Sequence, residues 1–577
     1  MENITQLVNN YLRGCISSCF PQVINVNEYS VIKSNKHDYQ FNRLAHLSQI
    51  TSLNINIVAD KLLAELSNNK IFDLVQIINI KQNIFLVLNI SNEYISRRIN
   101  IIYDDLLHNS SLPNPIINSL PPKILIDFSS PNIAKEMHIG HLRSTIIGES
   151  LCRIYEFCGC EVQRVNHIGD WGTQFGMLIA YIKKYDKKIG TLSELMNMYK
   201  ESRKLFDEDN EFHKNSLQET VKLQKGDEEN ICIWKEIREI SLTSFNEIYK
   251  ELDTYSEIKG ESFYQSRMND LIKELDGFIV EDNRMKIIRL DNYECPLILV
   301  KSDGGFTYDT SDLAALKYRL FEEKADQILY VVDSGQSLHF NMIFETAIKF
   351  GWCSSSQVKH IGFGVILGED GRRLKTRSGK TIKLLDVLND VKLHAKTITS
   401  QYCENTNRTM SPDMIETISN KIAVNSIKYS DLNNPRENNY KFDIKKMLNT
   451  KGNTAVYLMY ALARCQGILR KTPNLQDILN GQIVIDDLEI RNLSMKILKY
   501  PEVIESTIKE NAPHHICNYL YELVVSMTKF YNENRCMEIK NDQIIKVYEY
   551  RIRLINLVVI VIKKMFDLIG LEHVEQI

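Results

Sequence analysis

Apolar positions along the chain predict an α/β fold followed by a helical part. Residues 124–128 form an apolar run of strand length, and residues 142–157 repeat apolar side chains at helical spacing. This helical pattern ends near Gly159, and residues 162–165 form a second apolar run. A strand, a helix and a strand in this order form the βαβ unit of parallel, doubly wound sheets.

The same strand pattern returns after a long interval. Residues 328–332 predict a buried strand, followed by a loop and by a helix from about Ser337. Residues 360–365 predict another strand, and the polar segment 368–380 predicts the loop after it. The residues from about 185 to 290 are charged and mostly helical in pattern, so we expect an insertion between two halves of a nucleotide-binding fold.

The two ends of the chain differ from this middle part. Residues 1–120 begin with an amphipathic segment and contain the buried strand pattern 84–88, which indicates an α+β unit. A proline-rich connector at 113–122 closes that unit. From about residue 412 onward, apolar side chains recur at helical spacing with few strand signals, which predicts a helical bundle. We therefore expect three domains, at 1–120, 121–410 and 411–577.

Composition and net charge exclude few classes of function. The 577 residues are 44% hydrophobic and 25% charged, which is typical of a globular protein of several domains. The formal net charge of -3 excludes a strongly basic global field. A nucleic-acid partner would therefore have to meet local basic patches.

The cysteines and the apolar runs bear on metals and compartment. The 12 cysteines include no CxxC pair, so we expect no zinc site, and scattered thiols suit a reducing compartment. The first residues resemble neither a signal peptide nor an obvious transit peptide. The longest apolar run near the end, at 557–562, is too short to span a bilayer. We expect a cytoplasmic protein with no membrane partner.

The first candidate for chemistry is His138-Ile139-Gly140-His141, between a predicted strand and a predicted helix. Ligands of α/β sheets bind at the carboxyl ends of strands, and a helix N-terminus offers free amides to phosphate. The two imidazoles can donate to phosphate oxygens, and Gly140 lets a nucleotide base approach the backbone. Taken alone, these four residues fit two surface histidines at a helix start equally well.

The surroundings of these four residues decide between the two interpretations. The stretch SSPNIAKEMHIGHLRSTIIGESLCRIYEFCGCEVQRVNHIGDWGTQFG, residues 129–176, closely resembles arginyl-tRNA synthetases. In that family the HIGH element of class I synthetases lies between SPN and GDWGTQFG, flanks that other class I enzymes lack. Further matches keep the family order at 306–312, 330–339, 364–370 with 375–379, and 452–464. The first 120 residues match more loosely.

The resemblance implies a fold and an activity. It implies a class I Rossmann-type parallel-sheet catalytic domain, a tRNA-binding N-terminal domain and an all-α anticodon-binding bundle. The enzyme would activate L-arginine with ATP, giving arginyl-adenylate and pyrophosphate, and pass arginine to the 3′ end of tRNA(Arg). ATP is then a substrate that Mg²⁺ accompanies, and catalysis rests on positioning and on stabilising phosphate charge.

The resemblance also implies roles for the residues around the HIGH element. The SPN residues would meet the amino-acid end of arginine, although alone they fit a simple turn. His138 and His141 would stabilise the phosphate chain, with His141 also near the amino acid. The residues expected at arginine's amino-acid end are Ser130, Pro131, Asn132 and His141; those expected at ATP are His138, Gly140, His141 and His339.

Tyr308, Asp312 and Gln336 are the residues that the resemblance assigns to arginine's side chain. Tyr308 and Asp312 are four apart, so they share a face if the segment is helical. A carboxylate suits the planar guanidinium with two parallel charged hydrogen bonds, which lysine cannot match. Tyr308 would add a hydroxyl or a flat face, and Gln336 an acceptor. As isolated residues, Asp312 fits a helix cap and Tyr308 a core aromatic.

Three residues are candidates for the cation that contacts the α-phosphate of ATP. Residues 374–378 occupy the place of the second class I element, KMSKS, but Arg377 stands where its second lysine would be. Many arginyl-tRNA synthetases share this departure and carry a lysine just before HIGH, here Lys135. Lys375, Arg377 and Lys135 all remain candidates, although an isolated lysine is usually a solvated surface charge.

The partners implied are tRNA(Arg), L-arginine and ATP, with other synthetases in a complex not excluded. The family holds the anticodon with its helical bundle, where aromatic rings and guanidinium planes suit unstacked bases. The residues expected there are Asn453, Tyr457, Tyr460 and Arg464, with Tyr457 fitting a core position equally well. We expect arginine activation to wait for bound tRNA, and we expect no editing of mischarged tRNA.

Three alternatives compete with this interpretation. A nucleotidyl transferase with an HxGH site needs neither a helical bundle nor a 120-residue leading domain. A catalytically dead relative would have no reason to retain both histidines with Tyr308 and Asp312. A synthetase for another amino acid is disfavoured by the SPN, TYDTSD and DSGQ segments and by the absence of paired cysteines.

Overall fold

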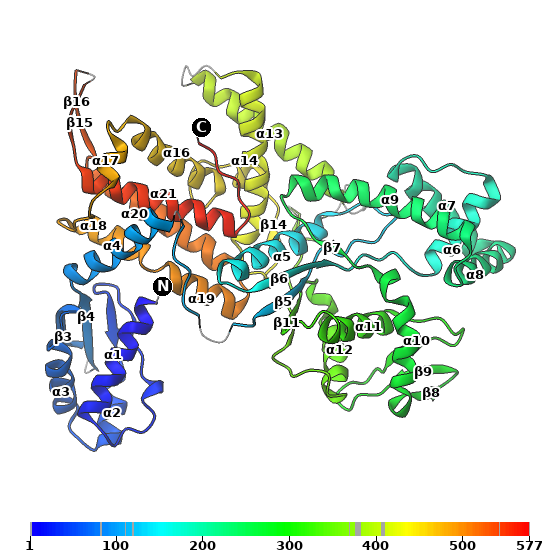
Figure 1. Ribbon diagram of the computed structural model, residues 1–577, viewed down its shortest axis with the longest axis horizontal. Coiled ribbons are helices and arrows are strands. Elements are labelled where there is room, and N and C mark those ends of the chain that lie inside the picture. Colours follow the sequence, from blue (N-terminus) through cyan, green and yellow to red (C-terminus); the bar gives the residue numbers. More distant parts are fainter. Residues whose placement is uncertain are drawn as a thin grey trace.

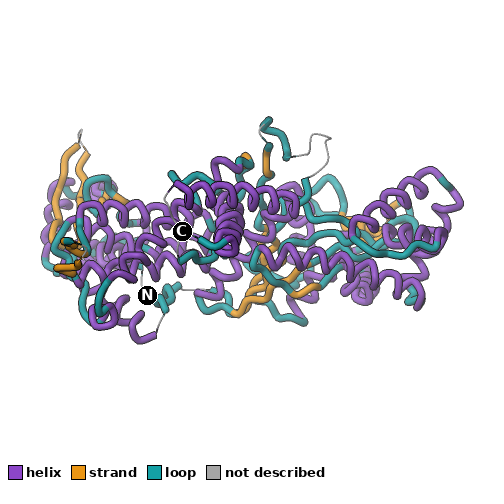
Figure 2. Tube along the Cα trace, turned by 90° about the horizontal axis from the view of Figure 1, so that it is seen from above, coloured by secondary structure: helices purple, strands orange, loops and turns teal. Residues whose placement is uncertain are grey.

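The computed structural model describes residues 3–80, 83–109, 111–117, 120–368, 370–374, 382–405, 410–541 and 543–575. The molecule is elongated, with strands gathered in a few places among many helices (Figures 1 and 2). A parallel sheet lies near the middle, a helical arm extends to one side and a helical bundle lies on the other (Figure 1). Within the described residues, no helix is long and apolar enough to cross a membrane.

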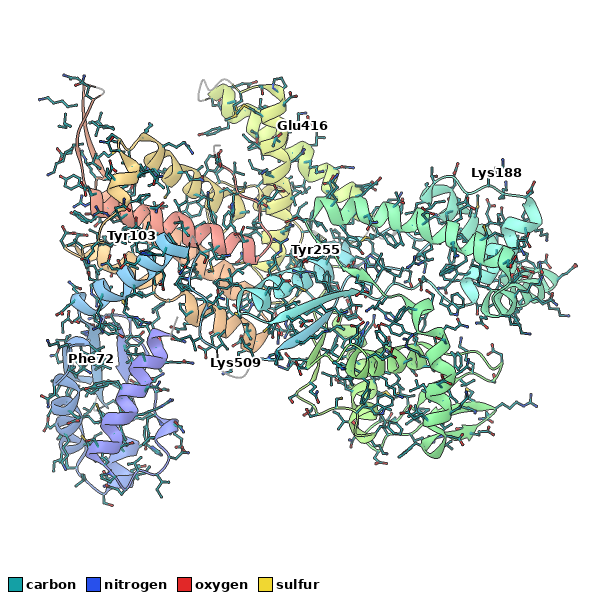
Figure 3. The ribbon with its side chains drawn as sticks, in the orientation of Figure 1. Phe72, Tyr103, Lys188, Tyr255, Glu416 and Lys509 are labelled. Atoms are coloured by element: carbon teal, nitrogen blue, oxygen red, sulfur yellow. The ribbon has the colours of Figure 1, made fainter. Side chains whose placement is uncertain are left out.

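The N-terminal unit is an antiparallel sheet covered by helices, as the sequence predicts. The predicted strand at 84–88 lies within β4 (Asn83–Ile90), which pairs with β2 and β3 in the order β1-β2-β4-β3. The other elements are α1 (Ile4–Cys19), β1 (Ile32–Lys33), β2 (Tyr39–Phe41), α2 (Leu44–Thr51), α3 (Ile55–Ser67), β3 (Phe72–Ile80) and α4 (Asn92–Asn109). Helix α4 lies against the bundle, where the Tyr103 hydroxyl donates to the Leu479 carbonyl at 3.1 Å (Figure 3).

Within the described residues, the central sheet has five parallel strands in the order β12-β11-β5-β6-β7. The strands are β5 (Lys123–Asp127), β6 (Glu161–Asn166), β7 (Glu257–Ile258), β11 (Gln327–Tyr330) and β12 (Val358–His360). The predicted βαβ unit is confirmed, with α5 (Ile139–Phe157) between β5 and β6. The chain runs outward from β5 to β7 and then returns to β11 beside β5. This reversal places a ligand-binding crevice at the carboxyl ends of β5 and β11.

One strand lies earlier than the sequence predicts. Residues 360–365 carry a strand pattern, but only Val358–His360 pair with β11. The chain then leaves the sheet: Gly364 N–H donates to the Arg436 carbonyl, and β13 (Ile366–Leu367) pairs with β14 (Tyr440–Lys441). The apolar run therefore reflects burial between the sheet and the bundle instead of one continuous strand.

The insertion is helical over only part of the predicted range of 185–290. A helical arm comprises α6 (Thr173–Tyr185), α7 (Leu192–Glu208), α8 (Asn210–Gln224) and α9 (Glu228–Glu251) (Figure 1). Strand β7 then already belongs to the main sheet. The next elements are α10 (Gln265–Glu274), β8 (Val280–Asp282), β9 (Met285–Ile288) and β10 (Leu297–Val300). Strands β8 to β10 form an antiparallel sheet, and runs of three or four residues are too short to show a strand period.

The connecting helices after β10 belong to the second half of the fold. They are α11 (Tyr308–Phe321) before β11 and α12 (Ser337–Lys349) before β12. Helix α11 buries Leu313, Leu316 and Arg319 against the sheet, so its first turn lies near the carboxyl ends of the strands. Figure 1 shows both helices on one side of the sheet, opposite the bundle.

The predicted C-terminal helical bundle is confirmed and contains one hairpin. Its helices are α13 (Leu384–Asn405), α14 (Pro412–Leu432), α15 (Ile444–Met447), α16 (Ala455–Lys471), α17 (Leu475–Leu479), α18 (Leu488–Ile497), α19 (Tyr500–Glu510), α20 (His514–Glu533) and α21 (Glu549–Leu568). The hairpin consists of β15 (Met537–Lys540) and β16 (Gln543–Val547). One apolar core runs from the N-terminal unit through α5 into the bundle, so these parts are packed together.

Candidate active site

Two histidines fold together at the N-terminus of α5. His138 caps the helix, and its Nδ1 accepts from the Gly140 N–H at 3.1 Å. The Nδ1 of His141 accepts from the His138 N–H at 3.0 Å, and the two ring centroids are 3.8 Å apart. Because each Nδ1 is an acceptor, each neutral ring carries its proton on Nε2. The pair therefore presents two Nε2–H donors.

Burial keeps both rings neutral. Burial, together with a smaller effect of the neighbouring His138, lowers the pKa of His141 to about 3. Burial also lowers the pKa of His138, helped by the positive charges of Arg373 and Lys135. Neutral imidazoles can stabilise phosphate oxygens by donating hydrogen bonds, without adding a charge to the buried site.

A cavity of about 270 Å³ opens beside His138 and Gly140, and Asp333, Arg373 and residues 363–366 also line it. It lies where the order of the sheet reverses, and the α5 N-terminus contributes to it. A side chain at Gly140 would come within 2.8 Å of His138 Cε1, so glycine here makes room for the His138 ring itself. His339, expected at ATP, does not line this cavity.

The SPN turn is held by the ends of two strands. Ser130 adopts a left-handed backbone, with φ of 48°. Its N–H donates to Asn166 Oδ1 at 3.0 Å and its hydroxyl donates to Asp127 Oδ1 at 3.2 Å. Pro131 is buried and Asn132 is exposed, with Asn132 bridged to Gly169. Such strained backbone persists only where its surroundings hold it, which is common at ligand sites.

At the other end of the site, Asp312 and Asp309 hold a charged histidine. His339 Nε2 lies 2.6 Å from Asp312 Oδ2, and its Nδ1 lies 3.2 Å from Asp309 Oδ1. Burial lowers the pKa of His339, but the hydrogen bonds to Asp309 and Asp312 outweigh this effect and raise it to about 10. His339 is therefore an imidazolium at the carboxylates of α11, where the sequence had placed it beside ATP.

A second carboxyl group, not expected from the sequence, lies near Asp312. Glu261 lies three residues after the end of β7, and burial together with the negative charges of Asp312 and Asp170 raises its pKa to about 8. Burial and the charges of Glu261 and Asp312 raise the pKa of Tyr308, whose side chain is 64% exposed. These three residues form a cluster, with two carboxyl groups, that suits a cation. No feature of the sequence singles out Glu261 among the charged residues around it.

The other residues predicted for the catalytic site make fewer contacts with the residues described above or lie outside the described part of the chain. Gln336 is exposed in a short 3₁₀ turn (Ser334–Gln336) before α12. Lys135 is exposed, and its Nζ lies 5.5 Å from the centroid of the Tyr199 ring on α7. Lys375 and Arg377 lie outside the described residues. Arg373, which the sequence analysis did not single out, lines the cavity beside His138 and lies 3.8 Å from Asp333.

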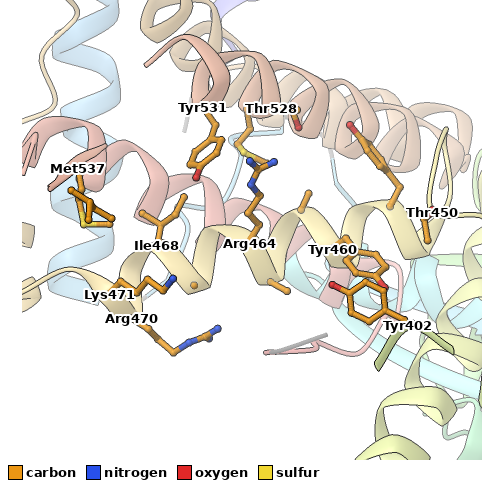
Figure 4. Close-up of a pocket in the computed structure, with 16 residues that line it drawn as sticks. Tyr402, Thr450, Tyr460, Arg464, Ile468, Arg470, Lys471, Thr528, Tyr531 and Met537 are labelled. Carbon is orange, nitrogen blue, oxygen red and sulfur yellow. The ribbon is translucent and has the colours of Figure 1, made fainter. Parts of the chain in front are cut away.

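The bundle contains a larger cavity, of about 820 Å³, lined by aromatic and basic side chains (Figure 4). Tyr457, Tyr460 and Arg464 of α16 line it, as do Tyr402 and Tyr531, which the sequence analysis missed. The Arg464 guanidinium carbon lies 4.1 Å from the centroid of the Tyr531 ring. Tyr402 meets Tyr460 edge to face at 5.6 Å.

Asn453 does not line this cavity. Its Nδ2 donates to Asn433 Oδ1 at 2.9 Å, and its Oδ1 accepts from the Tyr429 hydroxyl. Both ends of the amide are therefore used within the bundle, so Asn453 holds α14 against the segment that leads into α16. A periodic pattern cannot distinguish such an internal amide from one that faces a ligand.

Comparison with known families identifies the class to which this fold and site belong. Residues 106–444 match the family described as tRNA synthetases class I (R), catalytic domain. Residues 458–577 match the DALR anticodon binding domain. The α5 histidines, the parallel sheet and the helical bundle are thus those of a class I aminoacyl-tRNA synthetase.

Whole-chain relatives narrow the class to one family. An arginine–tRNA ligase of Acanthamoeba polyphaga mimivirus is 51% identical over the full length of both chains. A cytoplasmic arginine–tRNA ligase of Homo sapiens is 39% identical over 93% of this chain and 83% of that relative. The arginyl-tRNA synthetase structure from Plasmodium falciparum has 30% identity and a TM-score of 0.85, with both chains fully covered. The chain belongs to the arginyl-tRNA synthetase family.

Proposed function

We infer that this protein is an arginine–tRNA ligase, which activates L-arginine with ATP and transfers it to tRNA(Arg). The observation that carries this inference is the cluster of Tyr308, Asp312 and Glu261, which shares one sheet edge with the paired imidazoles of His138 and His141. A cation-binding cluster and a phosphate-binding helix N-terminus at one crevice suit a substrate that is a guanidinium at one end and is adenylated at the other.

For the activation step, we propose that the SPN turn holds the amino-acid end of arginine. The arginine carboxylate then attacks the α-phosphate of ATP, and pyrophosphate leaves. The Nε2–H groups of His138 and His141 stabilise the charge that develops on the phosphate oxygens. Lys135, Lys375 and Arg377 remain the candidate cations, and the position of Arg373 beside His138 adds a fourth. Mg²⁺ enters with ATP as part of the substrate, and no zinc is proposed.

For amino-acid choice, we propose that Asp312 accepts the guanidinium through Oδ1. Its Oδ2 is already bonded to His339. Burial alone would raise the pKa of Asp312, but the hydrogen bond to His339 and the positive charge of that ring outweigh burial and lower the pKa. Glu261 supplies the second carboxylate, and the exposed ring of Tyr308 covers the planar group. Lysine presents a point charge and leaves part of this arrangement unpaired, which costs it affinity.

For tRNA, we propose that the bundle cavity takes anticodon bases. Tyrosine rings offer stacking faces, and the guanidinium edge of Arg464 stays free of any carboxylate among the described residues. The three-domain division follows this assignment: a tRNA-binding domain at 1–120, the catalytic domain at 121–410 and the anticodon-binding domain at 411–577. The word cytoplasmic in the names of vertebrate relatives supports a cytoplasmic location.

Arginine-dependent exchange of pyrophosphate into ATP tests this function. We expect exchange with arginine when tRNA(Arg) is present, weaker exchange with canavanine and none with lysine. Omitting tRNA tests the expectation that activation waits for it. Binding of tRNA without any exchange would contradict the proposal and favour a catalytically dead relative. Size-exclusion chromatography of the native protein tests for association with other synthetases.

A further inference from the structure

A guanidinium that belongs to the protein lies beneath the arginine site. Arg319 of α11 is 1% exposed, and its Nη2 lies 2.7 Å from Asp127 Oδ2. The same nitrogen lies 3.4 Å from His167 Nδ1. Asp127 is the last residue of β5, and His167 directly follows β6. This one nitrogen atom therefore contacts residues at the carboxyl ends of two neighbouring strands, β5 and β6.

Two branches lead from Arg319 to the substrate residues. In the first, Asp127 Oδ1 accepts from the Ser130 hydroxyl at 3.2 Å, which reaches the amino-acid end of the site. In the second, His167 Nε2 lies 3.8 Å from Asp312 Oδ1, the oxygen that His339 leaves open. The arginine side chain always donates, so His167 Nδ1 accepts and the proton lies on Nε2, facing Asp312. Burial lowers the pKa of His167 and keeps this ring neutral.

Burying the charged guanidinium of Arg319 is not the arrangement that would best stabilise the fold. Its Nε and Nη1 atoms form no hydrogen bond of good geometry within the described residues. The Tyr264 and Tyr330 hydroxyls interact with the guanidinium, and the Tyr330 ring centroid lies 5.1 Å from the guanidinium carbon. A buried charge with unsatisfied donors is costly, and apolar residues of similar volume often serve stability better. The ion pair with Asp127 and the hydrogen bond to His167 connect Arg319 to residues next to the site, which points to a positional role.

We propose that Arg319 is a positioning residue that sets the distance between Ser130 and Asp312, and thereby selects an amino acid of arginine's length. This proposal rests on the proposed function, because the two ends of the site are defined by it. The rigid guanidinium holds Asp127 and His167 at a fixed separation. Ser130 and Asp312 then take their positions from those two side chains, without Arg319 touching the substrate.

The variant Arg319→Lys tests the proposal. Lysine keeps the positive charge but replaces the planar fork by a flexible ammonium, so it cannot hold both partners in one geometry. We expect KM for arginine to rise roughly tenfold, the usual range for misplacing one methylene-sized contact. We expect KM for ATP to change less than about twofold, because the phosphate residues do not depend on this path. Exchange assays with saturating tRNA give both constants.

The more specific readout is discrimination by length. Wild-type enzyme should prefer arginine over its homologues that are one methylene shorter or longer, and Arg319→Lys should reduce this preference severalfold. The matched control is Arg164→Lys on β6. Arg164 is also buried, at 5% exposure, and pairs with Glu149 and Glu156 away from the site residues. The control should leave the homologue preference unchanged, even if it lowers thermal stability.

A second variant keeps the test independent of the buried charge. His167→Asn cuts only the branch to Asp312 and should also raise KM for arginine and weaken the length preference. In the double variant with Arg319→Lys the two effects should not add, since both act through one path. A rise in KM for arginine and ATP alike, with the homologue preference retained, would overturn the proposal. Wild-type enzyme without arginine-dependent exchange would instead refute the proposed function.

Discussion

The phosphate end and the guanidinium end of the arginine site are built in different ways. At the phosphate end, the two neutral imidazoles come from one continuous segment, residues 138–141, and their hydrogen bonds run to backbone two or three residues away. The guanidinium end brings together Glu261, Asp312 and His339 from three segments, and its properties come from charges buried near each other. Local backbone geometry therefore sets the first end, and long-range electrostatics sets the second.

The largest expected effect is at the guanidinium end. Asp312→Asn removes the carboxylate that should pair with the guanidinium but keeps the size of the side chain. We expect kcat/KM for arginine to fall on the order of a thousandfold, because a buried charged hydrogen bond is lost and the substrate cation stays unpaired. The pyrophosphate exchange assay measures it.

Asp309→Asn is the matched control for that variant. It removes the other carboxylate that holds His339 but leaves Asp312 ionised, so its effect should be clearly smaller. A loss of less than tenfold in Asp312→Asn, or equal losses in the two variants, would show that Asp312 does not receive the guanidinium.

The next effect is at the phosphate end. In His138→Asn, the amide oxygen can still cap α5, but the Nε2–H donor is lost. We expect kcat for exchange to fall about a hundredfold, with KM for arginine within about twofold, because the donor acts on charge that develops in the transition state. If His138→Asn changed only KM for arginine, His138 would act on arginine binding and not on the transition state at the phosphate, which would contradict the proposed difference between the two ends.

A variant outside both ends tests whether the comparison is confined to the amino-acid site. Arg464→Ala removes the guanidinium from the bundle cavity. We expect KM for tRNA to rise roughly tenfold, the loss of about one stacking contact, while KM for arginine at saturating tRNA stays near wild type. Tyr531→Phe keeps the ring under Arg464 and is the conservative control, with a much smaller expected change.

The smallest effect is the pH dependence of arginine binding, and its sign follows from Glu261. The pKa of Glu261 is raised to about 8 by burial, Asp312 and Asp170, so in the empty site the group is mostly protonated at neutral pH. A bound guanidinium favours the ionised form, so the complex holds fewer protons and affinity rises with pH. Between pH 7 and 8 the gain should be about fivefold, from the change in the ionised fraction.

Calorimetry in buffers of different ionisation enthalpy measures this proton release. Glu261→Gln cannot ionise and should bind arginine more weakly with a flat profile over the same range. A flat profile in the wild-type protein would show that Glu261 does not meet the guanidinium. That result would leave Asp312 as the principal carboxylate of this end.

More of the phosphate end than of the guanidinium end could be predicted from the sequence. The roles proposed for His138, His141 and the SPN turn came from the family resemblance. The contacts between the two histidines are local, whereas the SPN turn is also held by Asn166, 36 residues further on. Asp312 was assigned to arginine by the family resemblance, and its spacing with Tyr308 predicted only that the two share one helical face. His339 was expected at ATP, and only the structure shows that its ring lies between Asp309 and Asp312. Asn453 was expected at tRNA, and only the structure shows that both ends of its amide are hydrogen-bonded within the bundle.

The sequence by itself determined the fold class, the family and the residues at the N-terminus of α5. Hydrophobic period and short-range hydrogen bonding are properties of neighbouring residues, so they can be read along the chain. Only the tertiary structure decided that Glu261 faces Asp312, that His339 is charged and that Arg319 joins two strands. His339 is 27 residues from Asp312 and Arg319 is 152 from His167, and the charge states depend on burial that exists only after these segments pack.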